Sequence, residues 1–186
     1  MWRTVSENPH HELFMRKALV EAQTALLAGE FPVGCVLVCE DRVVASGARK
    51  GTASHAPNET DHAEILALNR LSRRKPAIDT RRITAYCTLE PCLMCYGALL
   101  ISGISHIVYA YEDAMGGGTR CDLDAMPPLY RKAAISLIPH VLRHESLLLF
   151  KAYFENPANG YLKNTFLAEY TLAQPSAIPA AVTPNT

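Results

Sequence analysis

RITAYCTLEPCLMCYGALLIS, residues 82–102, changes from one secondary-structure pattern to another near its middle. Its first seven residues are rich in β-branched, aromatic and apolar types, which is typical of a strand. Pro91 suits the first position of a helix, and the apolar residues after it predict a helix to about residue 102. A strand that leads directly into a helix is a building unit of layered α/β folds.

Further segments on both sides carry strand patterns. FPVGCVLVCEDRVVASG (31–47) is apolar on either side of a polar turn at Glu40 and Asp41, which predicts a hairpin buried on both faces. HIVYAYED (106–113) predicts another strand. Residues 138–143 have the pattern of an edge strand, so the strands continue beyond the quoted segment.

Helical patterns separate these strands. We expect one helix over residues 9–29 and a second over 62–75, and residues 145–155 and 159–172 also have helical patterns. The central order of hairpin, helix, strand, helix and strand predicts an α/β sheet layered with helices. Such sheets bind ligands beyond the ends of their strands, where helix N-termini gather.

The chain has 186 residues, with 18 Lys and Arg balanced by 18 Asp and Glu. We predict a domain over residues 1–155, a helical extension over 156–173 and a disordered tail over 174–186. A chain without net charge has no global attraction to nucleic acid or anionic membranes. We expect a cytoplasmic location without a membrane partner, because the sequence shows no signal-peptide pattern and no apolar run of about 18 residues.

Cys92 and Cys95 lie three residues apart at the start of the helix predicted after Pro91. Their side chains then share one face of the first turn, where free backbone amides and the helix dipole lower thiol pKa values. In a reducing compartment such cysteines are more often metal ligands or buried thiols than disulfides. His62 would supply a third ligand if the N-termini of the two helices meet.

Three classes of protein are compatible with this Cys-x-x-Cys pair. A catalytic zinc site has three protein ligands and leaves the fourth position to water or hydroxide, whereas a structural zinc module needs a fourth protein ligand. A redox protein would instead cycle a Cys92–Cys95 disulfide, usually after the first strand of a thioredoxin-like unit. The chain has no second Cys-x-x-Cys pair, and this pair follows a later strand, so the pattern favours one catalytic zinc ion per chain.

Glu64 has two interpretations. It could form a reciprocal capping pair with Asp61 at the start of the second helix. Alternatively, side chains of a first turn lean back toward the N-terminus, so His62 could bind a metal beyond the helix tip while Glu64 reaches the bound water. Together with Cys92 and Cys95, the catalytic interpretation is favoured.

His-Ala-Glu at 62–64 followed by Pro-Cys-x-x-Cys at 91–95 resembles the signature of the cytidine/deoxycytidylate deaminase superfamily. FPVGCVLV, DHAEILAL and CTLEPCLMCYGAL are most similar to the branch that holds bacterial tRNA adenosine deaminases and guanine deaminases. The resemblance covers roughly residues 10–155. It implies a three-layer α/β/α sandwich with a five-stranded mixed sheet, a catalytic zinc ion and usually a homo-oligomer, for which we expect a homodimer.

Carried over by position, the resemblance makes His62, Cys92 and Cys95 the zinc ligands and Glu64 the proton shuttle. The implied enzyme is a hydrolase that converts an amino group on a purine or cytosine-type base to a carbonyl and releases ammonia. A structural zinc module is the alternative that is not an enzyme.

The sequence departs from this branch in one substrate-contacting stretch. The branch usually carries Gly-x-Asn after the second strand, whereas this chain has SGARKG (46–51) with Arg49 in that neighbourhood. Arg49 is either a changed substrate contact or an exposed loop arginine. His55, Asn58 and Pro91 are the other candidate substrate contacts.

Charge favours a small free base or nucleoside over tRNA as the substrate. The dense basic cluster comprises Arg70, Arg73, Arg74, Lys75, Arg81 and Arg82. Twelve helical residues at 1.5 Å each would place Arg74 about 18 Å from His62. After residue 150, Lys151 and Lys163 are balanced by Glu155 and Glu169. Because phosphate neutralisation is not visible in one chain, tRNA adenosine deamination is the second hypothesis.

The remaining cysteines and aromatic residues have structural interpretations. Cys35, Cys39 and Cys87 lie in predicted strands and are expected to be buried as small hydrophobic residues. An aromatic set near the C-terminus is spaced as a helical core or an oligomer face, with closure over a bound base as the alternative. This set comprises Tyr153, Phe154, Tyr161, Phe166 and Tyr170.

Overall fold

A computed structural model describes residues 8–53, 57–131 and 133–176 of the chain. These residues form a five-stranded mixed sheet with the strand order β2-β1-β3-β4-β5. The antiparallel neighbours are β1 with β2 and β1 with β3, while β3, β4 and β5 are parallel. The strands are β1 (Gly34–Cys39), β2 (Arg42–Ala48), β3 (Ile83–Leu89), β4 (His106–Tyr111) and β5 (Ser136–Ile138).

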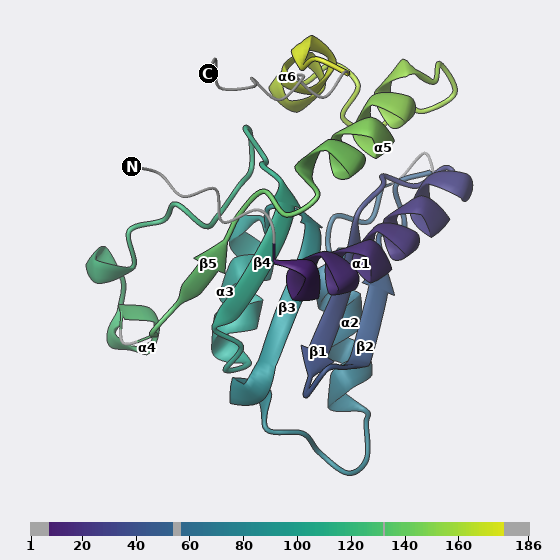
Figure 1. Ribbon diagram of the computed structural model, residues 1–186. Helices are drawn as coiled ribbons and strands as arrows, with labels where there is room; N and C mark the ends of the chain where they lie inside the picture. The colour runs from purple at the N-terminus through teal and green to yellow at the C-terminus, as the bar shows by residue number, and fades with distance from the viewer. Residues whose placement is uncertain (1–7, 54–56, 132, 177–186) are drawn as a thin grey trace, which may run out of the picture.

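Helices cover both faces of this sheet and one of its ends (Figure 1). The helices are α1 (Pro9–Leu27), α2 (Ala63–Ser72), α3 (Leu93–Ile101), α4 (Pro128–Arg131), α5 (Arg143–Glu155) and α6 (Phe166–Ala173), with short 3₁₀ turns at Thr80–Arg82 and Leu123–Ala125. In Figure 1, α1 crosses one face of the sheet, α2 and α3 lie behind the other face, and α5 and α6 lie beyond one end. The expected three-layer α/β/α sandwich is therefore confirmed.

Two apolar clusters hold the layers together. Phe14 and Met15 of α1 pack on Val36 and Tyr86 of the sheet, while Ala63 and other residues of α2 and α3 pack on the opposite face. Cys35, Cys39 and Cys87 are buried in the strands, as expected.

Close approach between α2 and the sheet depends on Gly47. A Cβ atom at Gly47 would lie 2.1 Å from the carbonyl oxygen of Ala63 and 2.9 Å from the amide nitrogen of Ala67. Any larger residue would push the start of α2 away from β2. Gly47 therefore helps to place the N-terminus of α2 at the end of the sheet.

Several boundaries differ from the sequence-based predictions. The fifth strand is Ser136–Ile138 and not 138–143, because His140 and Leu142 adopt positive φ values that end the extended run. The last helix begins at Phe166 and not at 159, since Thr165 caps it and Leu162 has a positive φ value. The helix predicted over 62–75 ends at Ser72.

Burial of the hairpin is also more uneven than predicted. All six residues of β1 are buried, but Arg42 and Val43 of β2 are exposed because β2 is the edge strand. The Glu40–Asp41 turn is confirmed, and both residues have positive φ values.

The division of the chain at residues 155 and 173 stays a prediction. Leu167 and Ala168 of α6 belong to the same apolar core as the sheet residues. Most of the predicted disordered tail, residues 177–186, lies outside the described residues. Within the described ranges, no helix is both long enough and apolar enough to cross a bilayer.

Candidate metal centre

The N-termini of α2 and α3 meet at the end of the sheet and bring three ligand side chains together. His62 is the N-cap residue of α2, Cys92 is the N-cap residue of α3, and Cys95 lies in the first turn of α3. The Nδ1 atom of His62 lies 3.5 Å from the Sγ atom of Cys92 and 3.4 Å from that of Cys95. All three ligand atoms lie within 4.8 Å of one another. The predicted meeting of the two helix tips is thus confirmed.

This donor set fits zinc. Ligand atoms around a tetrahedral zinc ion, with Zn–S near 2.3 Å and Zn–N near 2.0 Å, lie roughly 3.5 Å apart. The observed sulfur–nitrogen distances of 3.5 and 3.4 Å agree with that spacing. No fourth His, Cys, Asp or Glu of the described residues joins the group, so the arrangement differs from a four-ligand structural site.

The two thiols differ in acidity because they lie next to each other. A hydrogen bond with Cys95 lowers the pKa of Cys92 to about 4 against the cost of burial, and a hydrogen bond from His62 lowers it further. The same interaction with Cys92, together with burial, raises the pKa of Cys95. Burial opposes the charge on His62, but Cys92 and Glu64 leave the pKa of His62 raised. Cys92 is therefore the thiol that loses its proton more readily.

Glu64 lies beside the three ligands and is only 2% exposed. Its Oε2 atom accepts a hydrogen bond from the Cys95 thiol at 3.4 Å. Burial raises the pKa of this carboxyl group above its usual range. A raised pKa makes the carboxylate a better proton acceptor, which is the property that a general base requires. The side chain of Glu64 therefore points to the metal centre.

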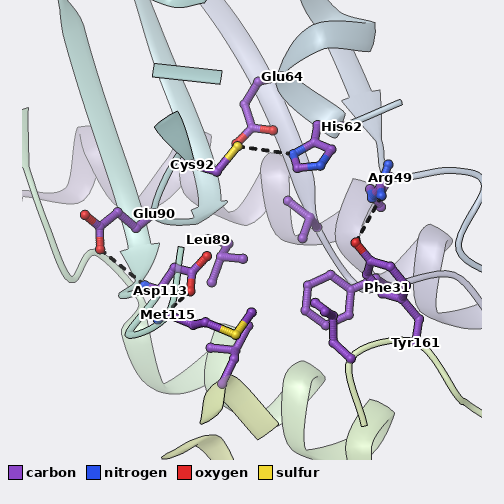
Figure 2. A pocket seen from close by; sticks show the side chains of 13 residues that line it. Phe31, Arg49, His62, Glu64, Leu89, Glu90, Cys92, Asp113, Met115 and Tyr161 are labelled. Atoms are coloured by element: carbon purple, nitrogen blue, oxygen red, sulfur yellow. Dashed lines mark hydrogen bonds between the residues drawn. The ribbon is translucent and has the colours of Figure 1, made fainter. Parts of the chain in front are cut away.

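A small pocket opens onto this centre, with a cavity volume of about 70 Å³. His62, Glu64 and Cys92 form its inner end, and Figure 2 shows Phe31, Arg49 and Tyr161 on one side and Asp113 and Met115 on another. Further apolar lining comes from Val33, Leu89, Leu162 and Leu167. The pocket is therefore apolar along its walls and polar at its ends.

Of the four predicted substrate contacts, the structure places Arg49 in the pocket lining and Asn58 and Pro91 outside it. Arg49 lines the pocket and is only 2% exposed, so it is not an exposed loop arginine. Asn58 is exposed and outside the pocket lining, and its Oδ1 atom accepts hydrogen bonds from Thr60. Pro91 is also outside the lining, and its carbonyl oxygen accepts from the amide of Gly118 at 2.8 Å. His55 lies outside the described residues.

The helix predicted from Pro91 begins two residues later, at Leu93. Cys92 has extended backbone angles and takes the N-cap position, so Pro91 precedes the cap. This correction moves Cys92 from the first turn of the helix to its tip. Cys92 and His62 are thus both N-cap residues of facing helices, with the Cys92 sulfur 3.5 Å from Nδ1 of His62.

Sequence reasoning missed several residues that line the pocket. Asp113 and Met115, in the loop after β4, line the pocket, and Glu90 lines it from the end of β3. Glu90 is buried and accepts a hydrogen bond from the amide of Asp113 at 3.2 Å. The available signals were the acidic residue next to Pro91 and the Gly-Gly-Gly run that follows Met115.

The glycine run packs against the tip of α3. A Cβ atom at Gly118 would lie 2.7 Å from the backbone nitrogen and Cα atom of Leu93. Only glycine allows this loop to approach so closely, and its amide then binds the carbonyl oxygen of Pro91. The loop therefore supports the helix tip that carries Cys92.

Comparison with known proteins decides the family. A family model described as the cytidine and deoxycytidylate deaminase zinc-binding region matches residues 8–111. The chain belongs to this family. Membership confirms the resemblance found in the sequence.

Named relatives lie within this deaminase family. A tRNA-specific adenosine deaminase from Buchnera aphidicola subsp. Baizongia pistaciae is 40% identical over 96 residues, which cover 52% of this chain and 58% of that protein. A tRNA-specific adenosine deaminase 2 from Xenopus tropicalis is 36% identical over 111 residues, covering 56% of this chain and 64% of that protein. The chain thus spans about three fifths of the length of these curated relatives.

A solved structure gives the same fold. It is described as "Biochemical and Structural Studies of A-to-I Editing by tRNA:A34 Deaminases at the Wobble Position of Transfer RNA" and is 30% identical to this chain, with a TM-score of 0.58. The match covers 68% of this chain and 96% of that chain. The five-stranded deaminase architecture is therefore shared.

Proposed function

We propose that the protein is a zinc-dependent hydrolytic deaminase that acts on an adenosine in tRNA. The observation that carries the chemistry is the buried Glu64 carboxyl beside His62, Cys92 and Cys95 at the inner end of a pocket. The substrate is inferred from the relatives, which are named for tRNA adenosine deamination and are 40% and 36% identical. This reverses the order of substrates that charge alone favoured.

His62, Cys92 and Cys95 would hold the zinc ion. When bound, zinc lowers the pKa of a coordinated water to about 7 and so supplies a nucleophile at neutral pH. Glu64 accepts the proton of that water and donates it to the ring nitrogen beside the amino-bearing carbon. The same carboxyl then takes the second proton of the former water from the added hydroxyl group and passes it to the departing amino group, which leaves as ammonia, while the oxygen of water remains on the base as a carbonyl.

The pocket walls position the base and limit access of water. Phe31, Leu89 and Leu167 provide apolar contact area for the faces of a planar ring. Close packing there excludes additional water from the reacting carbon, which strengthens electrostatic interactions with Glu64.

A free nucleobase or nucleoside is the second candidate substrate. It is favoured by the C-terminal segment, because Tyr161, Leu162 and Leu167 line the pocket and so add walls around a small ligand. In addition, two arginines of the basic cluster already donate hydrogen bonds to carbonyl oxygens of β2, Arg70 to that of Ser46 and Arg74 to that of Val44. These donors are therefore engaged within the chain and not directed at the phosphates of a tRNA.

The experiment that separates these candidates measures inosine formation in tRNA beside ammonia release from free adenine, guanine, cytosine and their nucleosides. We expect about one zinc ion per chain and inosine formation with tRNA. Turnover of free bases or nucleosides without activity on tRNA would support the second candidate. Full activity of protein that contains no metal would contradict both.

A further inference from the structure

Arg49 is a buried cation at the side of the pocket. Its side chain is 2% exposed, and its guanidinium group lies 5.7 Å from the centre of the Tyr161 ring. The Nη1 atom donates to the carbonyl oxygen of Lys50 at 3.1 Å, and the Nη2 atom donates to the Tyr161 hydroxyl at 3.4 Å (Figure 2). A guanidinium group cannot lose its charge by deprotonation, so burial requires an anionic partner.

The anionic partner in this structure is Glu59. Its Oε2 atom lies 3.6 Å from Nη2 of Arg49 and accepts a hydrogen bond from the Tyr161 hydroxyl at 2.6 Å. The Glu59 side chain is 64% exposed, whereas Arg49 is buried and lines the pocket together with Tyr161. Burial, and then the hydrogen bond to Glu59, raise the pKa of Tyr161, so its hydroxyl remains a donor at neutral pH. Arg49 and Tyr161 thus form an anion site that a surface carboxylate occupies.

We propose that Arg49 and Tyr161 bind a phosphate group of the substrate nucleotide, and that Glu59 occupies this site in the free protein until the phosphate displaces it. This inference rests on the proposed function, because it assigns a second contact of the same substrate. The phosphate could belong to a free mononucleotide or to the backbone of tRNA.

Two physical arguments support a phosphate over a neutral group. The guanidinium group has only donors, in a planar fork that matches phosphate oxygens. The Glu59 carboxylate is 64% exposed and lies 3.6 Å from Nη2 of Arg49, beyond ordinary hydrogen-bond distance, so a phosphate whose oxygens approach the guanidinium group more closely can replace it.

A structural interpretation of the same contacts predicts the opposite result. If Glu59 serves only to tie its loop to Arg49 and Tyr161, then its loss should weaken the pocket and every ligand in it. If Glu59 competes with the substrate phosphate, then its loss should strengthen the binding of phosphate-bearing ligands alone. The sign of one mutation therefore decides between the two.

The test measures dissociation constants by calorimetry for the full, zinc-loaded chain in a Glu64→Ala background that prevents turnover. Ligands are the 5′-monophosphates of adenosine, guanosine and cytidine, each beside its nucleoside, and tRNA in a separate series. Glu59→Gln and Arg49→Gln are introduced singly. Glu40→Gln is the matched control, because it removes an exposed carboxylate paired with Arg82 and changes the net charge equally.

We expect Glu59→Gln to tighten binding of monophosphates or tRNA by about two- to fivefold and to leave nucleoside binding unchanged. Arg49→Gln should weaken the same ligands by about tenfold or more, as expected when a charge-assisted hydrogen bond is lost. If the affinity for mononucleotides changes in this way, the bound phosphate is that of a free nucleotide. If only the affinity for tRNA changes, the bound phosphate belongs to a polynucleotide backbone.

The proposal is overturned if Glu59→Gln leaves the affinity for every phosphate-bearing ligand unchanged or lowers it. It is also overturned if Glu59→Gln raises the affinity for nucleosides by the same factor, or if Glu40→Gln has the same effect as Glu59→Gln. Should Arg49→Gln fail to fold, Glu59→Gln alone decides. These binding measurements need no turnover. The phosphate site can therefore be disproved while the wild-type chain still deaminates its substrate, and the proposed deamination can be disproved while phosphate still binds.

Discussion

At the scale of single residues, burial and the neighbouring thiol determine what the Glu64 carboxyl can do. It lies at the inner end of the pocket, accepts a hydrogen bond from Cys95 at 3.4 Å, and is outside the group of three ligand side chains. Glu64→Gln should therefore retain zinc while kcat falls by about 10²–10⁴, the contribution of a general acid or base. Metal analysis and steady-state kinetics on the same preparation check this. Loss of zinc from this variant would mean that Glu64 is a ligand.

The three ligand residues give a second prediction at this scale. Zinc binding requires deprotonated Cys92 and Cys95, so metal affinity should fall as the pH decreases. Removing zinc with a chelator should lower the melting temperature, since a ligand that binds only the folded state stabilises it. Scanning calorimetry before and after chelation, with zinc added back as the control, measures the effect. An identical melting temperature in both states would indicate that zinc is not bound by the folded chain.

Residue types and local sequence made the three metal ligands predictable, but they did not predict the rest of the pocket. His62, Cys92 and Cys95 combine metal-binding chemistry with positions at helix starts, and helix starts can be read from local sequence. The burial of Arg49 depends on contact with Tyr161, which is 112 positions away. Such long-range loop packing has no local signal, so Arg49 could be named from the sequence while its environment could not.

At the scale of elements, α6 is held over the pocket by a cluster around Glu112, at the end of β4. The carboxyl group of Glu112 accepts hydrogen bonds from Nε of Arg143 and from the hydroxyl of Tyr170, both at 2.7 Å. Burial opposes its charge, but hydrogen bonds from His140, Arg143 and Tyr170 hold its pKa well below the usual range. Since Leu167 of α6 lines the pocket, this cluster also positions a pocket wall.

This cluster predicts a pH-dependent stability. Because the pKa of Glu112 is lower in the folded state than the ordinary value of about 4.3, its stabilising contribution is fully present above that value. The contribution is lost as the pH falls through the folded-state pKa. Glu112→Gln should reduce the free energy of unfolding by about 1–3 kcal/mol at pH 7, and by less in strong acid. Urea unfolding of both proteins from pH 7 to pH 2 measures the difference. A constant difference across that range would contradict the assignment.

Element boundaries were predictable where capping and periodicity are local. The side chain of Asn8 accepts a hydrogen bond from the amide of His10 at 3.0 Å, and α1 begins at Pro9 as the sequence indicates. The region after β4 was predicted less well, because its short strand and turns depend on neighbours. β5, for example, is only three residues long and pairs with β4 alone.

At the scale of the whole molecule, the alternation of strands and helices was sufficient to predict the layers. An oligomer interface could not be predicted in this way, because it depends on which apolar side chains the folded chain leaves exposed. Exposed apolar side chains gather on α3 and α4, which pack against each other. Met94, Ile101 and Leu129 are 39%, 61% and 68% exposed. Met94 and Ile101 are seven residues apart in α3 and so share one face of the helix. An apolar face of this kind is typical of an interaction surface.

We therefore predict a homodimer that uses the face of α3 with Met94 and Ile101. Ile101→Asp should shift the chain to a monomer, because a carboxylate in an apolar interface loses its hydration without gaining a partner. Leu27→Asp is the matched control, since Leu27 is 82% exposed at the end of α1, a helix on the opposite face of the sheet. Sedimentation of the three proteins at equal concentration should show a dimer for the wild type and Leu27→Asp, and a monomer for Ile101→Asp. A wild-type monomer, or a dimer that survives Ile101→Asp, would place any interface elsewhere.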